Sequence, residues 1–288
     1  YNLDAMLHEV KYDNSQPFCD FIDSRIGKVI EDMKAPVKKG VKIYKIYNDG
    51  FVARTKSANI AFDLVRGECK KQKLLSDEQI DAIIEKCDVL FLSHNHGDHV
   101  DKYVVNKFIE AGKPVIAASN ILPDLKGVTH YRSESEILDK EVVLKSGEKL
   151  QVKIFPGHQS PMMCNIYVVT TPDKYTFAHT GDQYDKNDME WIAKVKDNAP
   201  KIDALTINCW SYQNRIIKID TETDRVVDEL IVGIQPTSLV MDKNHKLWTV
   251  TDGGYEGSPY GHEVPSLYRI DAETFQVERQ FKFNFGDA

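Results

Sequence analysis

The chain has 288 residues, 42% of them hydrophobic, and a formal net charge of −7. This length suits one large domain or two smaller ones, and no stretch approaches the roughly 18–20 apolar residues that a membrane-spanning helix needs. Acidic and basic residues are mixed without a basic patch, so a soluble globular protein is expected and nucleic-acid binding is not favoured. The compartment stays open between bacterial cytoplasm and periplasm.

The first element expected is an amphipathic helix over residues 15–35, with apolar residues at helical spacing. Ser15 suits its N-cap and Pro36 its end. We expect residues 1–36 to form a helical extension packed on the main domain.

A strand-rich region follows. The alternation of residues 41–47 and the turn at Asn48-Asp49-Gly50 predict a hairpin with residues 51–55. Further strands are expected at 59–64, 89–92, 114–118 and 202–208. Two hairpins are expected, one within 141–155 and a second from 165–171 with 174–178, and helices are expected at 76–87, 101–111 and 188–197. Strands mixed with helices in this order indicate sheets covered by helices on their outer faces.

Four potential metal ligands lie close together directly after the buried run Val89–Leu92. They are His94, His96, Asp98 and His99. In a tight loop, His94 and His96 can share one metal while Asp98 and His99 face a second. Imidazole and carboxylate ligands suit Zn²⁺, and manganese or iron remain alternatives. The other interpretation is a polar surface loop rich in histidine.

The pattern His94-x-His96-x-Asp98-His99 resembles the signature of the metallo-β-lactamase superfamily. Over residues of about 40–210, the order of the later motifs is similar too. This resemblance implies an αββα sandwich for residues 37–211, an α/β fold with the metals at one edge of the two sheets.

The resemblance also implies further ligands. It makes His158, after Pro156-Gly157, the third histidine ligand, and Asp182, after Thr180-Gly181, a carboxylate that bridges both metals. The alternatives are a structural histidine and a turn or helix-capping aspartate. Asp63 is expected to accept hydrogen bonds from the histidine loop without binding metal. Asp101 is expected to cap a helix, and His179 to be structural.

The function implied is metal-dependent hydrolysis of a small ester, lactone or phosphoester by a metal-bound hydroxide. The cofactors would be two divalent ions, with zinc favoured and manganese or iron as alternatives. The ligands would be His94, His96, Asp98, His99, His158 and Asp182, and Asp98 would also orient the nucleophile and shuttle a proton.

Residues 212–288 differ in character from the rest of the chain. The segment from Arg215 to Thr223 reappears from Ser266 to Thr274, at an offset of 51 residues. Strands and turns repeating at that period resemble YVTN-type β-propellers, so a C-terminal all-β propeller-like fragment is expected. With about one and a half repeats it cannot close, and its open strand edges suit an oligomer or partner contact.

The family pattern breaks near residues 210–214, after which the last metal-binding histidine is expected. Whether the join here between the family-like segment and the propeller-like segment is natural stays open. His245 and His262 are weak candidates for the missing ligand. The second metal site and the activity are therefore in question. The alternative function is a binding protein with a structural or degenerate metal site and a propeller-like recognition segment.

Five cysteines occur, in an odd number, widely spaced and without a C-x-x-C pair. Neither a disulfide framework nor a cysteine-rich zinc site is expected from this pattern. Most of the five are expected to be buried, apolar thiols instead.

Overall fold

The computed structural model describes residues 16–69, 72–159, 161–183, 188–199, 201–206, 214–220, 225–254 and 261–283. The chain divides into two compact units. The larger spans Asp13–Asn208, and the smaller consists of Tyr1–Tyr12 and Cys209–Ala288. Each unit is described by itself.

The first sheet of the larger unit has six strands in the order β1-β2-β3-β6-β7-β8. Strands β1 to β3 form an antiparallel meander, and β3, β6, β7 and β8 run parallel. The bounds are Lys42–Lys45, Phe51–Arg54, Asn59–Phe62, Val89–Leu92, Val115–Ala118 and Val128–Tyr131. Strand β8 was not predicted, because its four residues, three half-buried and one exposed, carry almost no hydrophobic pattern.

The second sheet has five strands in the order β15-β14-β13-β10-β9. The two predicted hairpins are confirmed, since β9 pairs with β10 and β13 with β14, both antiparallel. Strand β15 adds in parallel beside β14. The bounds in sheet order are Ala204–Thr206, Thr176–His179, Ile166–Thr170, Lys149–Phe155 and Leu138–Val143.

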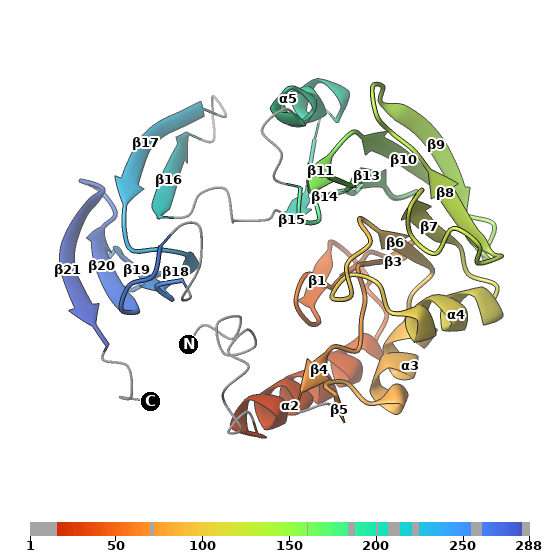
Figure 1. The fold of residues 1–288 in the computed structure, drawn as a ribbon, viewed down its shortest axis with the longest axis horizontal. Coiled ribbons are helices and arrows are strands. Elements are labelled where there is room, and N and C mark those ends of the chain that lie inside the picture. The colour runs from red at the N-terminus through yellow and green to blue at the C-terminus, as the bar shows by residue number, and fades with distance from the viewer. Residues whose placement is uncertain are drawn as a thin grey trace. The chain divides into compact units, whose positions relative to one another are not determined.

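Helices cover the outer faces of the two sheets (Figure 1). Helices α3 (Asp77–Lys86) and α4 (Lys102–Glu110) lie on the six-stranded sheet, and α5 (Met189–Asn198) packs on β10 of the other. Helix α2 (Gln16–Met33) packs beside α3. The unit is thus layered helix, sheet, sheet, helix, as expected. No helix in the described part of the chain is long and apolar enough to cross a membrane.

Sequence signals explain where the helices begin. Ser76 and Gln79 form the predicted capping box of α3. Asp101 caps α4 by accepting a hydrogen bond from the amide of Tyr103, as predicted. Helix α2 is anchored to the unit by Ile22, Ile26 and Met33, which are fully or almost fully buried.

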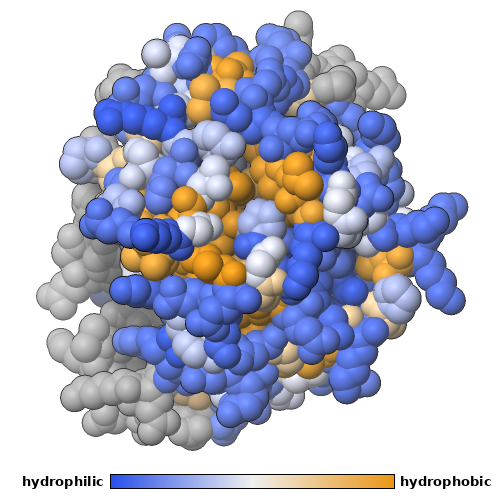
Figure 2. All heavy atoms as spheres, turned by 90° about the vertical axis from the view of Figure 1, so that its right-hand side faces the viewer, coloured by the Kyte–Doolittle hydropathy of each residue, from blue (hydrophilic) through white to orange (hydrophobic). Residues whose placement is uncertain are grey.

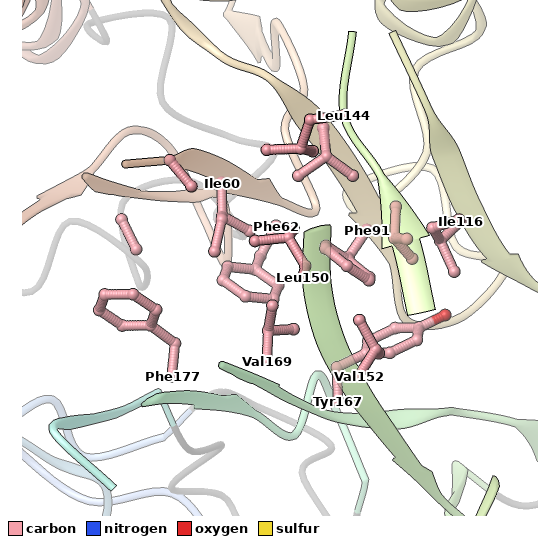
Figure 3. Close-up of a cluster of buried hydrophobic side chains, with 14 of the residues drawn as sticks. Ile60, Phe62, Phe91, Ile116, Leu144, Leu150, Val152, Tyr167, Val169 and Phe177 are labelled. Carbon is pink, nitrogen blue, oxygen red and sulfur yellow. The ribbon is translucent and has the colours of Figure 1, made fainter. Parts of the chain in front are cut away.

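The main hydrophobic core lies between the two sheets (Figure 3). Phe62 and Phe91 stack with ring centroids 5.5 Å apart, and Tyr167 reaches them from the opposite sheet, 5.1 Å from Phe91. A second cluster around Phe155 and Ile166 packs beneath α5. Polar residues cover much of the face seen in Figure 2, with apolar patches among them. Burial of both sheets' inner faces is the main stabilising term of this sandwich.

Two small hairpins complete the unit. Strands β4 (Glu68–Cys69) and β5 (Gln72–Lys73) pair near the start of α3, and β11 (His158–Gln159) pairs with β12 (Met162–Met163). Cys87 and Cys164 are buried free thiols, as expected. Cys19 is an exception, since it forms a disulfide bond that the wide spacing of the cysteines did not indicate.

The smaller unit is all-β in its described residues. It contains the hairpin of β16 (Arg215–Asp220) and β17 (Arg225–Ile231), and an antiparallel sheet in the order β18-β19-β20-β21. The bounds of this sheet are Pro236–Met241, Lys246–Thr251, Ser266–Asp271 and Gln276–Lys282. A propeller is not confirmed, because the described residues form an open sheet and a separate hairpin.

The 51-residue sequence repeat nevertheless corresponds to a repeated pair of strands in the structure. Strands β16 and β17 reappear as β20 and β21 at the same offset, and both hairpins carry a register shift at the equivalent place, Lys218/Ile219 and Arg269/Ile270. Ile216, Tyr268 and Ile270 belong to one buried cluster, so the two hairpins pack on each other. The smaller unit is therefore built from a duplicated, bulged hairpin.

Candidate metal centre

The histidine loop begins where strand β6 ends. His94 and His99 are fully buried, and the amides of His99 and Val100 both donate to the carbonyl of His96, which makes the loop a tight turn. The ring centroids of His94 and His99 lie 4.1 Å apart, and those of His94 and His96 lie 4.7 Å apart. The loop therefore holds its three imidazoles together, as the sequence predicted.

Asp182 joins these imidazoles from the end of strand β14. Its Oδ2 lies 3.8 Å from Nε2 of His94 and 3.3 Å from Nε2 of His99. Two groups of ligand atoms, each within 4.8 Å of one another, share Asp182: one with His94 and His96, the other with His99 and Asp49. Asp182 is therefore common to two groups of potential ligand atoms.

Asp182 reaches the loop because Gly181 precedes it. Gly181 has φ of +51°, and a Cβ there would lie 2.4 Å from Oγ of Ser93. Only glycine allows so close an approach in this backbone conformation. Gln159 also holds Asp182, donating from Nε2 to its Oδ2 at 3.2 Å.

Asp63 is the buried centre of the hydrogen-bond network behind the loop. Its Oδ1 accepts from the amide of Ser93 at 2.7 Å, and its Oδ2 receives the Ser93 hydroxyl. The same Oδ2 lies 2.8 Å from Nδ1 of His99 and 2.9 Å from Nε2 of His179. Asp63 thus accepts hydrogen bonds from the histidine loop, as predicted, and fixes the orientation of the His99 ring.

Charges in the cluster set the protonation of its members. Burial and the nearby charge of His99 lower the pKa of His94 to about 4, so His94 is neutral. Burial alone would lower the pKa of His99, but Asp63 and Asp182 outweigh it and raise the pKa to about 11. Burial likewise raises the pKa of Asp63, yet His99 and His179 hold it well below its usual range.

The residues fit a bound cation. Nε2 of His99 is fully buried, and within the described residues it makes no hydrogen bond of ordinary geometry. Because Nδ1 of His99 faces Asp63, this orphaned Nε2 is the ring nitrogen left to bind a cation. A cation that replaces the proton on His99 satisfies it, and imidazole and carboxylate donors suit zinc, manganese or iron.

Asp98 lies at the margin of the cluster, whereas the side chain of His158 faces Asp188. Oδ2 of Asp98 is 3.8 Å from Nε2 of His99, and the side chain is 44% exposed. His158 lies on β11, and its Nδ1 is 3.0 Å from Asp188. Neither belongs to the tight ligand groups among the described residues, so their roles as ligands stay predictions.

Sequence reasoning missed Asp49, which was read only as part of a hairpin turn. The turn packs against Asp63 and so brings Asp49 into the cluster. In the sequence, the only sign of such a role was that Asp49 is a carboxylate. It also missed Asp188, which precedes α5 but caps no helix amide and instead faces His158. Of the two candidates for a last histidine, His245 occupies the β18–β19 turn and His262 an exposed bridge with Gly254, both in the smaller unit.

Comparisons with known proteins find no matching family model and no curated protein that matches. Several solved structures are similar in part. A possible metal-dependent hydrolase from Veillonella parvula is 16% identical, with a TM-score of 0.41 over 69% of this chain and 78% of that one. A metallo-β-lactamase from Pontibacter korlensis is 16% identical, with a TM-score of 0.35 over 58% and 90%.

The diiron β-hydroxylase CmlA from Streptomyces venezuelae is 14% identical, with a TM-score of 0.41 over 59% of this chain and 35% of that one. At such identities and TM-scores, these likenesses establish neither family nor activity. The case for function therefore depends on the geometry of the cluster.

Proposed function

We propose that the larger unit is a metal-dependent hydrolase of the metallo-β-lactamase type, acting on a small ester, lactone or phosphoester. The observation that carries this proposal is the pair of ligand groups that share Asp182 beside the orphaned Nε2 of His99. The layered fold and the order of the motifs along the chain support it.

The proposed ligands divide into two sets. His94, His96 and Asp182 would hold one divalent cation, and Asp182 and His99 would hold a second. The resemblance adds His158 to the first set and Asp98 to the second. Bound cations would supply Lewis acidity, lowering the pKa of water and stabilising negative charge on the substrate oxygen.

The protein's own groups would orient the ligands and move the proton. Asp63 fixes the rings of His99 and His179. Asn48 donates from Nδ2 to Oδ2 of Asp98 at 2.6 Å, which holds this exposed carboxylate at the rim of the cluster. We assign Asp98 the proton transfer: water adds to the carbonyl carbon or phosphorus, Asp98 takes its proton, and the departing oxygen receives that proton as its bond breaks.

Metal content and hydrolysis of the full chain test this function. We expect purified protein to carry close to two equivalents of zinc, manganese or iron and to hydrolyse generic ester or phosphodiester substrates. The isosteric variant Asp98→Asn should lower kcat by about a hundredfold or more, because it cannot accept the proton. Less than about half an equivalent of metal together with no hydrolysis would reject the proposal.

A second candidate, recognition of a partner by the smaller unit, is favoured by its exposed edge. Strand β18 lies at one edge of its sheet, and Leu239, Val240 and Met241 are 51–61% exposed. Apolar edge strands invite pairing with another chain. Val240→Lys should then abolish association measured by light scattering and leave metal content unchanged. An unsubstituted chain that is monomeric and captures no partner would reject this candidate.

A further inference from the structure

The turn between β1 and β2 carries a carboxylate into the metal cluster. Asp49 lies in this turn, and its side chain is only 19% exposed. Its Oδ2 is 3.7 Å from Nε2 of His179, and one ligand atom of Asp49 lies within 4.8 Å of ligand atoms from both His99 and Asp182. A buried carboxylate among other carboxylates is costly unless a cation or a hydrogen-bond donor compensates it.

The backbone holds Asp49 in this place. The amide of Gly50 donates to the carbonyl of Tyr47 at 2.8 Å, which closes the turn, and Asn48 has φ of 46°. A Cβ on Gly50 would lie 2.9 Å from the carbonyl oxygen of Tyr47 and 3.0 Å from that of Asp63. The turn is therefore pressed against the end of β3, directly beside the hydrogen-bond network behind the histidine loop.

Two independent observations point to a cation beside Asp49. The first is the orphaned, fully buried Nε2 of His99, which belongs to the same ligand group. The second is charge: Asp49, Asp63 and Asp182 all face this region, and Asp98 lies at its rim. Asp63 already accepts from four donors, so Asp49 and Asp182 are the carboxylates left to face a cation here.

We propose that Asp49 is a ligand of the second cation, beside His99 and Asp182. This inference rests on the proposed function. The second site would then consist of Asp49, Asp182 and His99, with Asp98 beside it, and would contain more oxygen donors than the first. Because carboxylates suit manganese and imidazoles suit zinc, the second site should accept Mn²⁺ more readily, relative to Zn²⁺, than the first.

The test is equilibrium binding of Zn²⁺ and of Mn²⁺ to the chelator-treated full chain. The unsubstituted protein is compared with Asp49→Asn, which keeps the shape of the side chain, and with Asp139→Asn. Asp139 is a matched control, because it is an exposed aspartate on β9 paired with Lys153. Far-ultraviolet circular dichroism and the Tm of each metal-free variant establish that it folds.

We expect the unsubstituted chain to bind two equivalents. Asp49→Asn should weaken the second equivalent at least about tenfold, as ligand-shell substitutions do, with the larger loss for Mn²⁺. Asp139→Asn should bind both ions like the unsubstituted chain. Two equivalents with unchanged affinities in a folded Asp49→Asn variant would overturn the role of Asp49 and leave the hydrolase proposal standing. No binding of either ion by the unsubstituted chain would overturn both.

Discussion

Oδ2 of Asp63 lies 2.8 Å from Nδ1 of His99, and both side chains are fully buried. This contact fixes which nitrogen of His99 faces Asp182. It also connects strand β3 to the loop that follows β6, so one carboxylate couples the stability of the fold to the geometry of the site.

Asp63→Asn should be strongly destabilising. The amide would present its own N–H groups to a pocket where the Ser93 amide, the Ser93 hydroxyl and two imidazoles already face the carboxylate. Removing one partner of a buried charged network costs about 3–5 kcal/mol. Urea unfolding of the metal-free protein measures this loss, and a change below about 1 kcal/mol would show that Asp63 carries little of the network's energy.

Gly181→Ala should impair metal binding more than a glycine substitution elsewhere. The added methyl would collide with Ser93 and push Asp182 away from His94 and His99. Gly147→Ala is the matched control, because Gly147 also has positive φ, +88°, but nothing lies within 4 Å of its added Cβ. The control should lose only about 1 kcal/mol of stability from backbone strain and keep its Zn²⁺ affinity. Equal Zn²⁺ affinities in the two variants would contradict the positioning role of Gly181.

Arg66→Met should destabilise the packing of α3 and α4 together. Arg66 pairs through Nε and Nη2 with both carboxylate oxygens of Asp101, and its Nη1 lies 2.8 Å from Asp77 at the start of α3. Side-chain exposures of 14% and 11% for Arg66 and Asp101 make this a largely buried pair. We expect a loss of about 2–4 kcal/mol, mainly from leaving the buried Asp101 carboxylate without its cationic partner. Arg132→Met, at a side chain that is 65% exposed, should change stability by less than about 1 kcal/mol.

Asp173 should give the fold an acid-sensitive contribution to stability. Burial raises the pKa of Asp173, but hydrogen bonds from Ser57, Thr171 and Thr55 outweigh it, so the folded-state pKa is lowered. A lowered pKa stabilises the fold above the unfolded value of about 3.9, and this contribution is lost as pH falls through the folded value. The difference in Tm between the unsubstituted chain and Asp173→Asn should thus be constant near neutral pH and shrink below about pH 4. A difference independent of pH would contradict this role.

Much of the larger unit could be predicted from its sequence because its signals are local. Hydrophobic alternation, the Ser76 capping box and the Asp101 cap fix elements within a few residues, and these were confirmed. The close approach of the imidazoles in the histidine loop also follows from local spacing, since a tight turn must bring His94, His96 and His99 together.

Only tertiary structure decided the rest of the cluster. Asp49 enters it because the β1–β2 turn packs against the end of β3, and Asp188 faces His158 across 30 positions of sequence. The short strand β8 has no hydrophobic pattern that would predict it. The sequence repeat in the smaller unit did not reveal that its described strands form an open sheet and a hairpin. The physical reason is separation along the sequence. Sequence patterns depend on residues that are neighbours in the chain, whereas the carboxylates of a site are brought together by the packing of distant segments.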